Sequence, residues 1–337
     1  MEIGIYSNAF RTLSLEAMLE KVSSLGIKMV ELACGEYSGF CHVKPEVLLA
    51  DNQKLIEFKQ SLDKHGVQLS CLSAHGNPIS PNKDIAGRSD RAMRNAVLLA
   101  EKLELDTITV FSGCPGDCEQ SQYANWITVN WPLDYNEAYK WQWDVKLIPY
   151  WKDFAAFARS HKVNKIALEM HPGQCCYNPG TIRRLRDVVG EEIGVNLDFS
   201  HLLWQRMDPI QVIKSLNGCI FHMHAKDIGF DEAEVQANGY ITTTSITKPT
   251  ERPWNFRTVG YGHDLFYWKN IFAELRRVGY DRVSSIEIEC ELVDIPYGVE
   301  KSVEFLKQCM LFDNLEKKDK WGEYIRRSEA SYFENIQ

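Results

Sequence analysis

Four apolar runs in the second half of the chain carry polar or ionisable side chains at every second position. Successive side chains of a strand point to opposite faces, so the apolar residues of each run share one face and the polar residues share the other. Run by run, the residues on the polar face are Glu169 and His171; Asn196 and Asp198; His222, His224 and Lys226; and Glu287 and Glu289. If the runs are neighbouring parallel strands, these side chains converge where the strands end.

One side chain from each run would complete a site for a divalent cation. We expect the ligands to be Glu169, Asp198, His224 and Glu287, with Glu289 as the alternative to Glu287. Three carboxylates buried together are costly unless a cation neutralises them. We expect one divalent ion, Mn²⁺ first, with Mg²⁺, Co²⁺ or Zn²⁺ as alternatives for this oxygen-rich set. Such a cation polarises a carbonyl and acidifies the neighbouring C–H, which predicts proton abstraction and a stabilised enediolate.

Eight β-like runs alternate with helical stretches. We expect strands over Glu2–Ser7, Met29–Ala33, Gln68–Ala74, Thr107–Phe111, Lys165–Met170, Ile193–Leu197, Ile220–Lys226 and Val283–Glu289. Helical periodicity, with caps or prolines at several starts and glycines at several ends, predicts helices over Ser14–Leu25, Pro45–His65, Asp90–Leu103, Lys152–His161, Gly180–Val189, Asp208–Leu216, Leu265–Val278 and Tyr297–Leu311. This alternation predicts an α/β fold, a (β/α)8 TIM barrel; an open doubly wound sheet is the alternative.

The barrel accounts for most of the chain. We expect residues 1–311 to form a single TIM-barrel domain and residues 312–337 a charged C-terminal extension that contacts solvent or a partner. Long connections follow the fourth strand (residues 112–150) and the seventh (residues 227–264), on the face where such barrels hold their active sites. The first is rich in aromatic residues, among them Trp126 and Trp131. They would form a substrate wall or lid, or else a packed loop core or subunit contact.

Composition excludes several classes of partner. The 38 lysines and arginines against 46 aspartates and glutamates give a net charge of −8, which disfavours nucleic acid and anionic membranes. The sequence contains no apolar run long enough for a transmembrane helix and no signal-peptide pattern at Met1–Tyr6, so we expect a cytoplasmic protein. In a reducing compartment the ten cysteines are expected to be thiols.

At these same residues the chain resembles the xylose isomerase-like TIM barrel superfamily, which includes sugar isomerases, sugar-phosphate isomerases/epimerases and inosose dehydratases. The matching segments are residues 168–173 (LEMHPG), 197–201 (LDFSH), 222–227 (HMHAKD), 257–262 (RTVGYG) and 285–289 (SIEIE). The likeness is strong over the last four strands and looser over the first four. In this superfamily Glu, Asp, His and Glu from strands five to eight hold the metal, which the resemblance carries over to Glu169, Asp198, His224 and Glu287.

The resemblance also implies roles around the metal. Glu169 and Glu287 resemble the acid/base pair of ketose epimerases, and Arg257 resembles the family's substrate-contacting arginine. We expect the remaining substrate-binding residues to be His75, His171, His201, Lys226, Trp126 and Trp131, with structural roles as the alternative. For Arg257 the alternative is a loop arginine that pairs with Asp227 or Asp264.

The leading functional hypothesis is a metal-dependent sugar isomerase or epimerase. Its first rival is a lyase that eliminates from an oxo-sugar, as an inosose dehydratase or as a deglycosidase of 3-oxo-glycosides, since one enediolate serves all three outcomes. An apurinic endonuclease, which resembles the chain at several ligands, would need a histidine where Phe111 and Ser112 stand. A non-catalytic scaffold is the fourth reading. We expect a small carbohydrate substrate, and assembly as a homo-oligomer or with another subunit.

Overall fold

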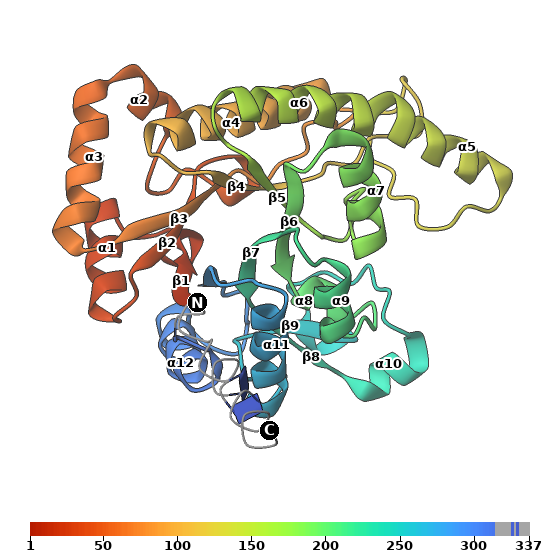
Figure 1. The fold of residues 1–337 in the computed structure, drawn as a ribbon. Coiled ribbons are helices and arrows are strands. Elements are labelled where there is room, and N and C mark those ends of the chain that lie inside the picture. Colours follow the sequence, from red (N-terminus) through yellow and green to blue (C-terminus); the bar gives the residue numbers. More distant parts are fainter. Residues whose placement is uncertain (314–324, 327, 330–337) are drawn as a thin grey trace, which may run out of the picture.

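Eight parallel strands close into a barrel in the computed structural model, which describes residues 1–313, 325–326 and 328–329. The order around the barrel is β1-β10-β7-β6-β5-β4-β3-β2, and Figure 1 labels these strands apart from β10. The strands are β1 Glu2–Tyr6, β2 Met29–Ala33, β3 Gln68–Ser73, β4 Thr107–Phe111, β5 Lys165–Glu169, β6 Ile193–Asp198, β7 Ile220–Ala225 and β10 Val283–Ile286. The predicted (β/α)8 barrel is therefore confirmed.

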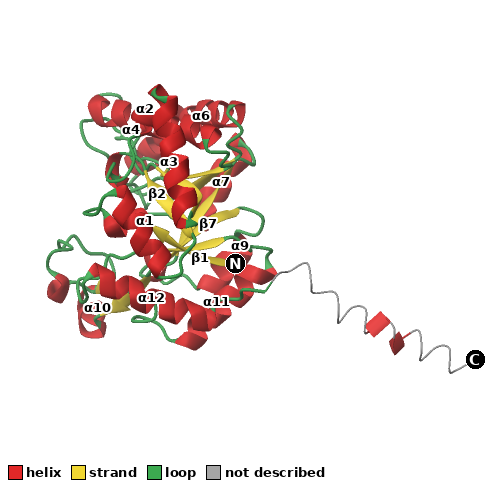
Figure 2. Ribbon diagram, turned by 90° about the vertical axis from the view of Figure 1, so that its left-hand side faces the viewer, coloured by secondary structure: helices red, strands yellow, loops and turns green. Residues whose placement is uncertain are grey.

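Helices surround the strands, as Figure 2 shows with helices in red and strands in yellow. They are α1 Leu15–Ser24, α2 Pro45–Ala50, α3 Asn52–His65, α4 Lys83–Lys102, α5 Leu133–Trp141, α6 Ile148–Ser160, α7 Pro179–Val189, α8 Ser200–Leu203, α9 Pro209–Ser215, α10 Glu232–Asn238, α11 Leu265–Arg277 and α12 Ile295–Cys309. Short turns of other helical types are η1 Ser7–Phe10, η2 Glu36–Ser38, η3 Gln142–Leu147 and η4 Pro249–Glu251. The apolar side chains between strands and helices form the core.

Local sequence explains most helix boundaries. Asp208 accepts a hydrogen bond from the backbone N of Gln211 and precedes Pro209, as expected for a capped start. The predicted Pro45–His65 helix is wrong as one element, because Asp51 leaves helical geometry and caps a new helix, α3. Gly66 ends α3 in the left-handed conformation.

The connection after β4 is more helical than expected. The predicted helix Lys152–His161 begins much earlier, because α5 runs through the π turn η3 directly into α6. Pro149 lies at the start of α6 and lacks a backbone N–H, and a π turn accommodates such a missing donor within a continuous helix. Trp143 and Trp151 of this helix are fully buried, so part of the aromatic content packs the core rather than facing a substrate.

The connection after β7 contains a separate two-stranded sheet. Strand β8 (Asp227–Phe230) pairs antiparallel with β9 (Trp254–Arg257). Buried Asp227 accepts hydrogen bonds from the backbone N–H groups of Gly260, Gly262 and His263, which fixes the chain that follows β9. A Cβ at Gly262 would lie 2.0 Å from the carbonyl oxygen of Ile228, so only glycine fits there.

The chain after α12 continues briefly along the barrel. The Arg276 guanidinium donates a hydrogen bond to the backbone oxygen of Leu311 at 2.6 Å and pairs with Asp313 at 3.2 Å. Most of the predicted extension, residues 312–337, lies outside the described residues, so its separation from the barrel stays a prediction. All ten cysteines are free thiols, and no helix among the described residues is long and apolar enough to cross a membrane.

Candidate metal centre and active site

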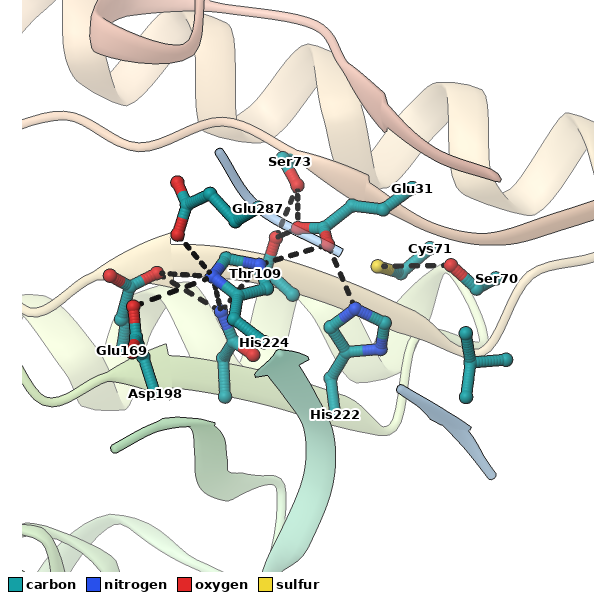
Figure 3. A network of polar contacts seen from close by, with 12 residues as sticks. Glu31, Ser70, Cys71, Ser73, Thr109, Glu169, Asp198, His222, His224 and Glu287 are labelled. Atoms are coloured by element: carbon teal, nitrogen blue, oxygen red, sulfur yellow. Dashed lines mark hydrogen bonds and ion pairs between the residues drawn. The ribbon is translucent and has the colours of Figure 1, made fainter. Parts of the chain in front are cut away.

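Four predicted ligands meet at the C-terminal mouth of the barrel (Figure 3). Glu169 and Asp198 end β5 and β6, His224 lies on β7, and Glu287 follows β10. One ligand atom of each lies within 4.8 Å of the others, so the four can share one ion. We call these four residues the metal quartet. Strand β10 ends at Ile286, so the predicted Val283–Glu289 strand is too long, and Glu287 lies just beyond it.

Parallel pairing explains how the quartet assembles. Asp198 stands opposite His224 in the pairing of β6 with β7, and Glu169 stands opposite Asn196 in that of β5 with β6. The Nδ1 atom of His224 lies 3.0 Å from Glu287 Oε2, 3.5 Å from Glu169 Oε2 and 4.0 Å from Asp198 Oδ2. This imidazole nitrogen therefore faces all three carboxylates.

The quartet offers suitable atoms for a divalent cation. Asp198 Oδ2 and Glu287 Oε2 are buried and lie beside the Lys226 ammonium at 2.9 and 2.7 Å, while the other Asp198 oxygen accepts a hydrogen bond from the backbone N of Ser200 at 2.9 Å. Three buried carboxylates carry more negative charge than one ammonium neutralises, which favours a further bound cation. Three carboxylates with one imidazole form an oxygen-rich set suited to Mn²⁺, Mg²⁺ or Co²⁺, and acceptable to Zn²⁺. The residues present fit such an ion.

A buried lysine lies at the edge of the quartet. The Lys226 ammonium is 2.9 Å from Asp198 Oδ2, 2.7 Å from Glu287 Oε2 and 2.9 Å from Glu289 Oε2. Burial lowers the pKa of Lys226, but the surrounding carboxylates outweigh it and hold that pKa well above its usual value. The Glu289 side chain is 45% exposed and absent from the metal quartet, so the geometry favours Glu287 over Glu289 as a ligand.

Glu169 is held by three side chains. His75 Nε2 lies 3.1 Å from its Oε2 and His201 Nε2 lies 3.2 Å from its Oε1, while the Asn196 amide donates to Oε2 at 3.0 Å. Burial raises the pKa of Glu169, but hydrogen bonds from His201 and His75 and the nearby imidazoles hold it well below its usual range. Glu169 is therefore an ionised carboxylate, as a ligand or a base must be.

His171 packs against the same group. Its ring centroid lies 4.1 Å from that of His201, and its Nδ1 donates to the backbone oxygen of Pro172 at 2.7 Å. Burial, with a further effect from His201, lowers the pKa of His171 to about 3. A neutral imidazole at the mouth can donate or accept a hydrogen bond without adding charge.

Two carboxylates of the quartet, Glu169 and Glu287, line a cavity of about 210 Å³. It includes the predicted His75, His171, His201 and Lys226, and residues of the first half of the chain that sequence reasoning missed: Tyr6, Asn8, Tyr37, Ser38 and Phe111. Their only signal was position, since they end or follow the first, second and fourth strands. Polar residues directly after strands of a barrel face its active-site side.

Three predicted substrate-binding residues lie outside this cavity. Arg257 has its guanidinium 4.0 Å from Glu291, and the expected partner Asp227 instead pairs with His263 at 2.7 Å. Trp126 packs edge-on against Tyr177 in a neighbouring cavity. Trp131 is 76% exposed and lines a third. Substrate contacts by these residues stay predictions.

A second polar cluster lies deeper in the barrel, below the quartet. Glu31 on β2 is fully buried, and its Oε2 is 2.9 Å from the Nε2 atoms of both His222 and His224 (Figure 3). Its Oε1 accepts hydrogen bonds from Ser73 and, at 2.9 Å, from Thr109. Burial raises the pKa of Glu31, but the two imidazoles hold it well below its usual range. Sequence reasoning missed Glu31, although it is the one charged residue in its apolar strand.

A closed parallel barrel with titratable side chains gathered at its C-terminal mouth defines a TIM barrel with a candidate metal centre. The chain belongs to the xylose isomerase-like TIM barrel family, whose sequence profile matches residues 19–309. It is 36% identical over 311 residues to the uncharacterized protein YfiH of Bacillus subtilis (strain 168), covering 91% of this chain and 99% of that one.

Solved structures extend this likeness in fold. The probable 3-DHS dehydratase AsbF of Bacillus anthracis matches with a TM-score of 0.62 and 17% identity, over 91% of this chain and 99% of that chain. D-psicose 3-epimerase of Clostridium cellulolyticum H10 matches with a TM-score of 0.56 and 15% identity, over 92% and 99%. At this identity they show the shared fold, which epimerases and a dehydratase both use.

Proposed function

We propose that the protein is a divalent-metal-dependent sugar isomerase or epimerase that removes a proton from the carbon next to a carbonyl. The observation that carries this proposal is the convergence of three carboxylates and His224 on one point at the barrel mouth, where Glu169 and Glu287 also line a cavity. The proposed ligands are Glu169, Asp198, His224 and Glu287. A cation bound there, Mn²⁺ as first choice, would act as a Lewis acid toward a substrate carbonyl and hydroxyl.

Glu169 and Glu287 supply the proton transfers in this proposal. Both carboxylates are present in ionised form, since neighbouring imidazoles and Lys226 outweigh burial and lower their pKa values. One takes the proton from the substrate carbon. The other first takes up a proton from water and then delivers it to the opposite face, and the first carboxylate releases its proton to water before the next turnover. His75 and His201 donate to Glu169 and fix its orientation, and Lys226 can stabilise the negative charge that develops on a substrate oxygen.

The resulting enediolate has three fates. Reprotonation at the same carbon inverts it, reprotonation at its neighbour moves the carbonyl, and loss of a β-substituent gives elimination. Elimination is the second candidate function, favoured by a large cavity with aromatic walls beside the site, where a leaving group has room. The epimerase and dehydratase folds among similar structures fit both candidates.

A hydrogen-exchange experiment tests the proposal before the substrate is known. The protein is stripped with EDTA, reloaded with Mn²⁺, Mg²⁺, Co²⁺ or Zn²⁺, and incubated in D₂O with D-fructose, D-tagatose and a 3-oxo-glucoside. We expect deuterium at the carbon next to the carbonyl, followed by ¹H NMR, only with loaded protein. A new sugar indicates epimerisation or isomerisation, and a released aglycone indicates elimination. No deuterium with any loaded form and any of these compounds would contradict the proposal.

The expected partners follow from this chemistry. We propose a small carbohydrate as substrate, with neither nucleic acid nor membrane as partner, in keeping with the net charge of −8. A cytoplasmic location and assembly as a homo-oligomer or with another subunit stay predictions. Size-exclusion chromatography with light scattering tests the assembly.

A further inference from the structure

A second cavity opens on the same side of the barrel as the candidate site. It measures about 630 Å³, three times the volume of the cavity at the quartet, which is about 210 Å³. Its aromatic lining consists of Trp126, Tyr177, Trp204 and Tyr240. Polar side chains, among them Gln205, Arg206 and Asn238, complete it. We call it the aromatic side pocket.

The same four barrel segments build both cavities. The ends of β4, β5, β6 and β7 and the chain that follows each of them contribute residues to both cavities. Examples are the pairs Phe111 and Trp126, His171 and Tyr177, His201 and Trp204, and Lys226 and Tyr240. No residue of β1, β2, β3 or β10 lines the side pocket. It therefore lies to one side of the mouth, beside Glu169 and Asp198.

Aromatic contacts connect the two cavities. The ring of Phe256 lies edge-on to His201 with centroids 5.4 Å apart, and the Lys226 ammonium lies 4.6 Å from the same ring. Phe256 packs on Trp254 at 5.6 Å, and Trp254 stacks on Trp204 at 5.5 Å with planes 9° apart. The wall between the cavities is thus a short aromatic stack.

Two hydrogen bonds and an unusual backbone conformation also hold the pocket. Gln205 donates its side-chain amide to the carbonyl oxygen of His201 at 2.8 Å and to that of Tyr177 at 3.2 Å. Arg206 has φ +63°, a left-handed conformation uncommon for a non-glycine residue, and its guanidinium lies 5.5 Å from the Tyr240 ring centroid. A solvent-exposed arginine is held over an aromatic wall at the pocket.

We propose that the aromatic side pocket binds a second ring of the substrate, so that the substrate is a glycoside and not a free monosaccharide. This inference rests on the proposed function, because the first ring must lie at the quartet. Aromatic faces stack on flat rings and on sugar C–H surfaces, while Gln205, Arg206 and Asn238 offer hydrogen bonds to the edges. The second ring is an aromatic aglycone or another sugar, which share this chemistry.

Binding of unreactive probes tests the pocket without requiring turnover. Mn²⁺-loaded protein is titrated by calorimetry with methyl β-D-glucopyranoside, p-nitrophenyl β-D-glucopyranoside and cellobiose, which share one ring and differ beyond it. We expect at least one two-ring probe to bind about tenfold more tightly than the methyl glucoside. A preference for the nitrophenyl glucoside identifies an aromatic aglycone, and one for cellobiose a second sugar.

Variants place the preference in the pocket. Tyr240→Ala and Trp126→Ala should each remove most of the preference for the two-ring probe, with the affinity for the methyl glucoside unchanged. Tyr123→Ala, at an exposed residue of the same connection, and Ile246→Ala, in the cavity of about 350 Å³ across the mouth, should retain this preference. Circular dichroism verifies that each variant is folded, and Arg206→Ala serves if Trp126→Ala is not.

The outcomes separate this inference from the proposed function. Equal affinity for all three probes would overturn the side pocket as a subsite. So would a preference for a two-ring probe that is lost in Ile246→Ala and kept in Tyr240→Ala. Both conclusions hold even where deuterium exchange occurs. A tenfold preference that Tyr240→Ala removes supports the pocket. If no deuterium exchange accompanies that preference, it is the proposed reaction that fails.

A different observation carries a second inference, about Glu31. The two nitrogens of His224 face different carboxylates: Nδ1 faces the quartet, 3.0 Å from Glu287, and Nε2 lies 2.9 Å from Glu31 (Figure 3). Tyr6 stacks on the imidazole with centroids 5.6 Å apart, so the ring has little freedom to turn. A histidine that binds a metal through one nitrogen commonly donates the other N–H to a carboxylate.

We infer that Glu31 is a positioning residue for the proposed metal ligand His224. By accepting the Nε2–H, it leaves the Nδ1 lone pair facing the quartet. Its own orientation is fixed by Ser73 and Thr109 on one oxygen and by His222 on the other. The competing interpretation is a second cation held by Glu31, His222 and His224, whose ligand atoms also lie within 4.8 Å of one another.

Metal titration distinguishes these interpretations. Calorimetry with Mn²⁺ should give one ion per chain for the wild type, and Glu31→Gln should bind one ion with affinity reduced about 10- to 100-fold. The matched variant His222→Asn removes the other imidazole that contacts Glu31 Oε2. Its Mn²⁺ affinity should stay within about threefold of that of the wild type. ¹⁵N-histidine spectra of the Mg²⁺ form should show His224 with its proton on Nε2, and this preference should weaken in Glu31→Gln.

Two results would overturn the role of Glu31. Two ions per wild-type chain, falling to one in Glu31→Gln with the remaining affinity unchanged, would make the cluster a metal site in its own right. Equal losses of Mn²⁺ affinity in Glu31→Gln and His222→Asn would show that Glu31 supports the barrel in general and does not specifically position His224.

Discussion

The two ends of the barrel both carry charged residues, in different balance. At the N-terminal end two carboxylates have two cationic partners each: Asp106 pairs with Lys165 and with Arg282, and Asp281 pairs with Arg276 and the chain's amino terminus. At the C-terminal mouth one ammonium, Lys226, lies among Asp198, Glu287 and Glu289.

This difference separates structural charge from functional charge. Pairs at the N-terminal end are partly exposed and nearly neutral, so they can be explained by solubility and local stability. The carboxylates at the mouth are mostly buried and outnumber the nearby fixed cation, an arrangement that is unfavourable until further positive charge is bound. Cavity volume alone would not identify the functional end of the barrel, because the N-terminal end also has a cavity, of about 480 Å³.

The largest effect should come from removing a base at the mouth. Glu169→Gln and Glu287→Gln keep the side-chain size but cannot accept the substrate proton, so each should slow deuterium exchange by at least about 10³-fold. The measurement is the exchange rate by ¹H NMR at saturating Mn²⁺. Glu289→Gln is the matched control and should retain exchange within about tenfold. Full activity in Glu169→Gln would remove Glu169 from the mechanism.

Removing the Lys226 ammonium at the mouth should have the next largest effect. Without metal, Lys226→Met leaves buried carboxylates unpaired and should reduce the free energy of unfolding by about 3–5 kcal/mol. Lys165→Met at the N-terminal end should lower the free energy of unfolding by less than about 1 kcal/mol, because the ion pair of Lys165 with Asp106 is partly exposed. Urea denaturation in EDTA measures both. Similar losses at the two ends would contradict the contrast between them.

Added Mn²⁺ should then reduce the loss in Lys226→Met more than in Lys165→Met. A cation bound by the quartet supplies the positive charge that the lysine no longer provides, and ligand binding to the folded state raises its stability. The measurement is the same denaturation series repeated with saturating Mn²⁺.

The pH dependence of metal binding provides a smaller effect. Burial lowers the pKa of His224, but Glu31 and Glu287 outweigh it and hold that pKa well above its usual value of about 6.5 in the metal-free protein. A cation binds the neutral imidazole and must displace this proton, so affinity should rise about tenfold per pH unit below that pKa. Calorimetry between pH 6 and 8, in buffers of different ionisation enthalpy, should give about one proton released per ion. Affinity independent of pH would contradict it.

Sequence patterns predicted the mouth well because its residues repeat one simple geometry. Polar side chains at alternate positions of β5, β6 and β7 identified Glu169, Asp198 and His224, and parallel pairing brings their strand ends together. The sequence favoured Glu287 but left Glu289 as the alternative, because the two alternate to the same face of the predicted strand. The strand ends at Ile286, and the coordinates place a Glu287 oxygen within 4.8 Å of the other three ligand atoms, in a group that does not include Glu289.

Features that depend on contacts distant in sequence were missed. Glu31 binds residues about 190 positions away, and nothing local to Met29–Ala33 indicates those partners. Likewise, the pairing of β8 with β9 joins segments separated by α10, within what reads as one long connection. The continuous helix through η3 was missed because the π turn that accommodates Pro149 has no periodicity of its own.

The smallest expected effect comes from a carboxylate at the N-terminal end, and its pH dependence sharpens the contrast. Burial raises the pKa of Asp106, but hydrogen bonds from Lys165 and Thr107 and the charge of Arg282 lower it well below its usual value. A carboxyl with a depressed folded pKa stabilises the protein above its unfolded pKa of about 3.9, and this contribution is lost as the pH falls through the folded value.

Asp106→Asn should therefore lower the free energy of unfolding by at most about 1 kcal/mol at pH 7, because the Asp106 side chain is half-exposed. The difference in this free energy between the variant and the wild type should shrink below about pH 4. Urea denaturation at both pH values measures it. Deuterium exchange and Mn²⁺ affinity should be unchanged at pH 7, since Asp106 lies at the opposite end of the barrel from the quartet. A loss of metal affinity in this variant would show that the two ends are coupled, and the charge balance of each end could then no longer be interpreted separately.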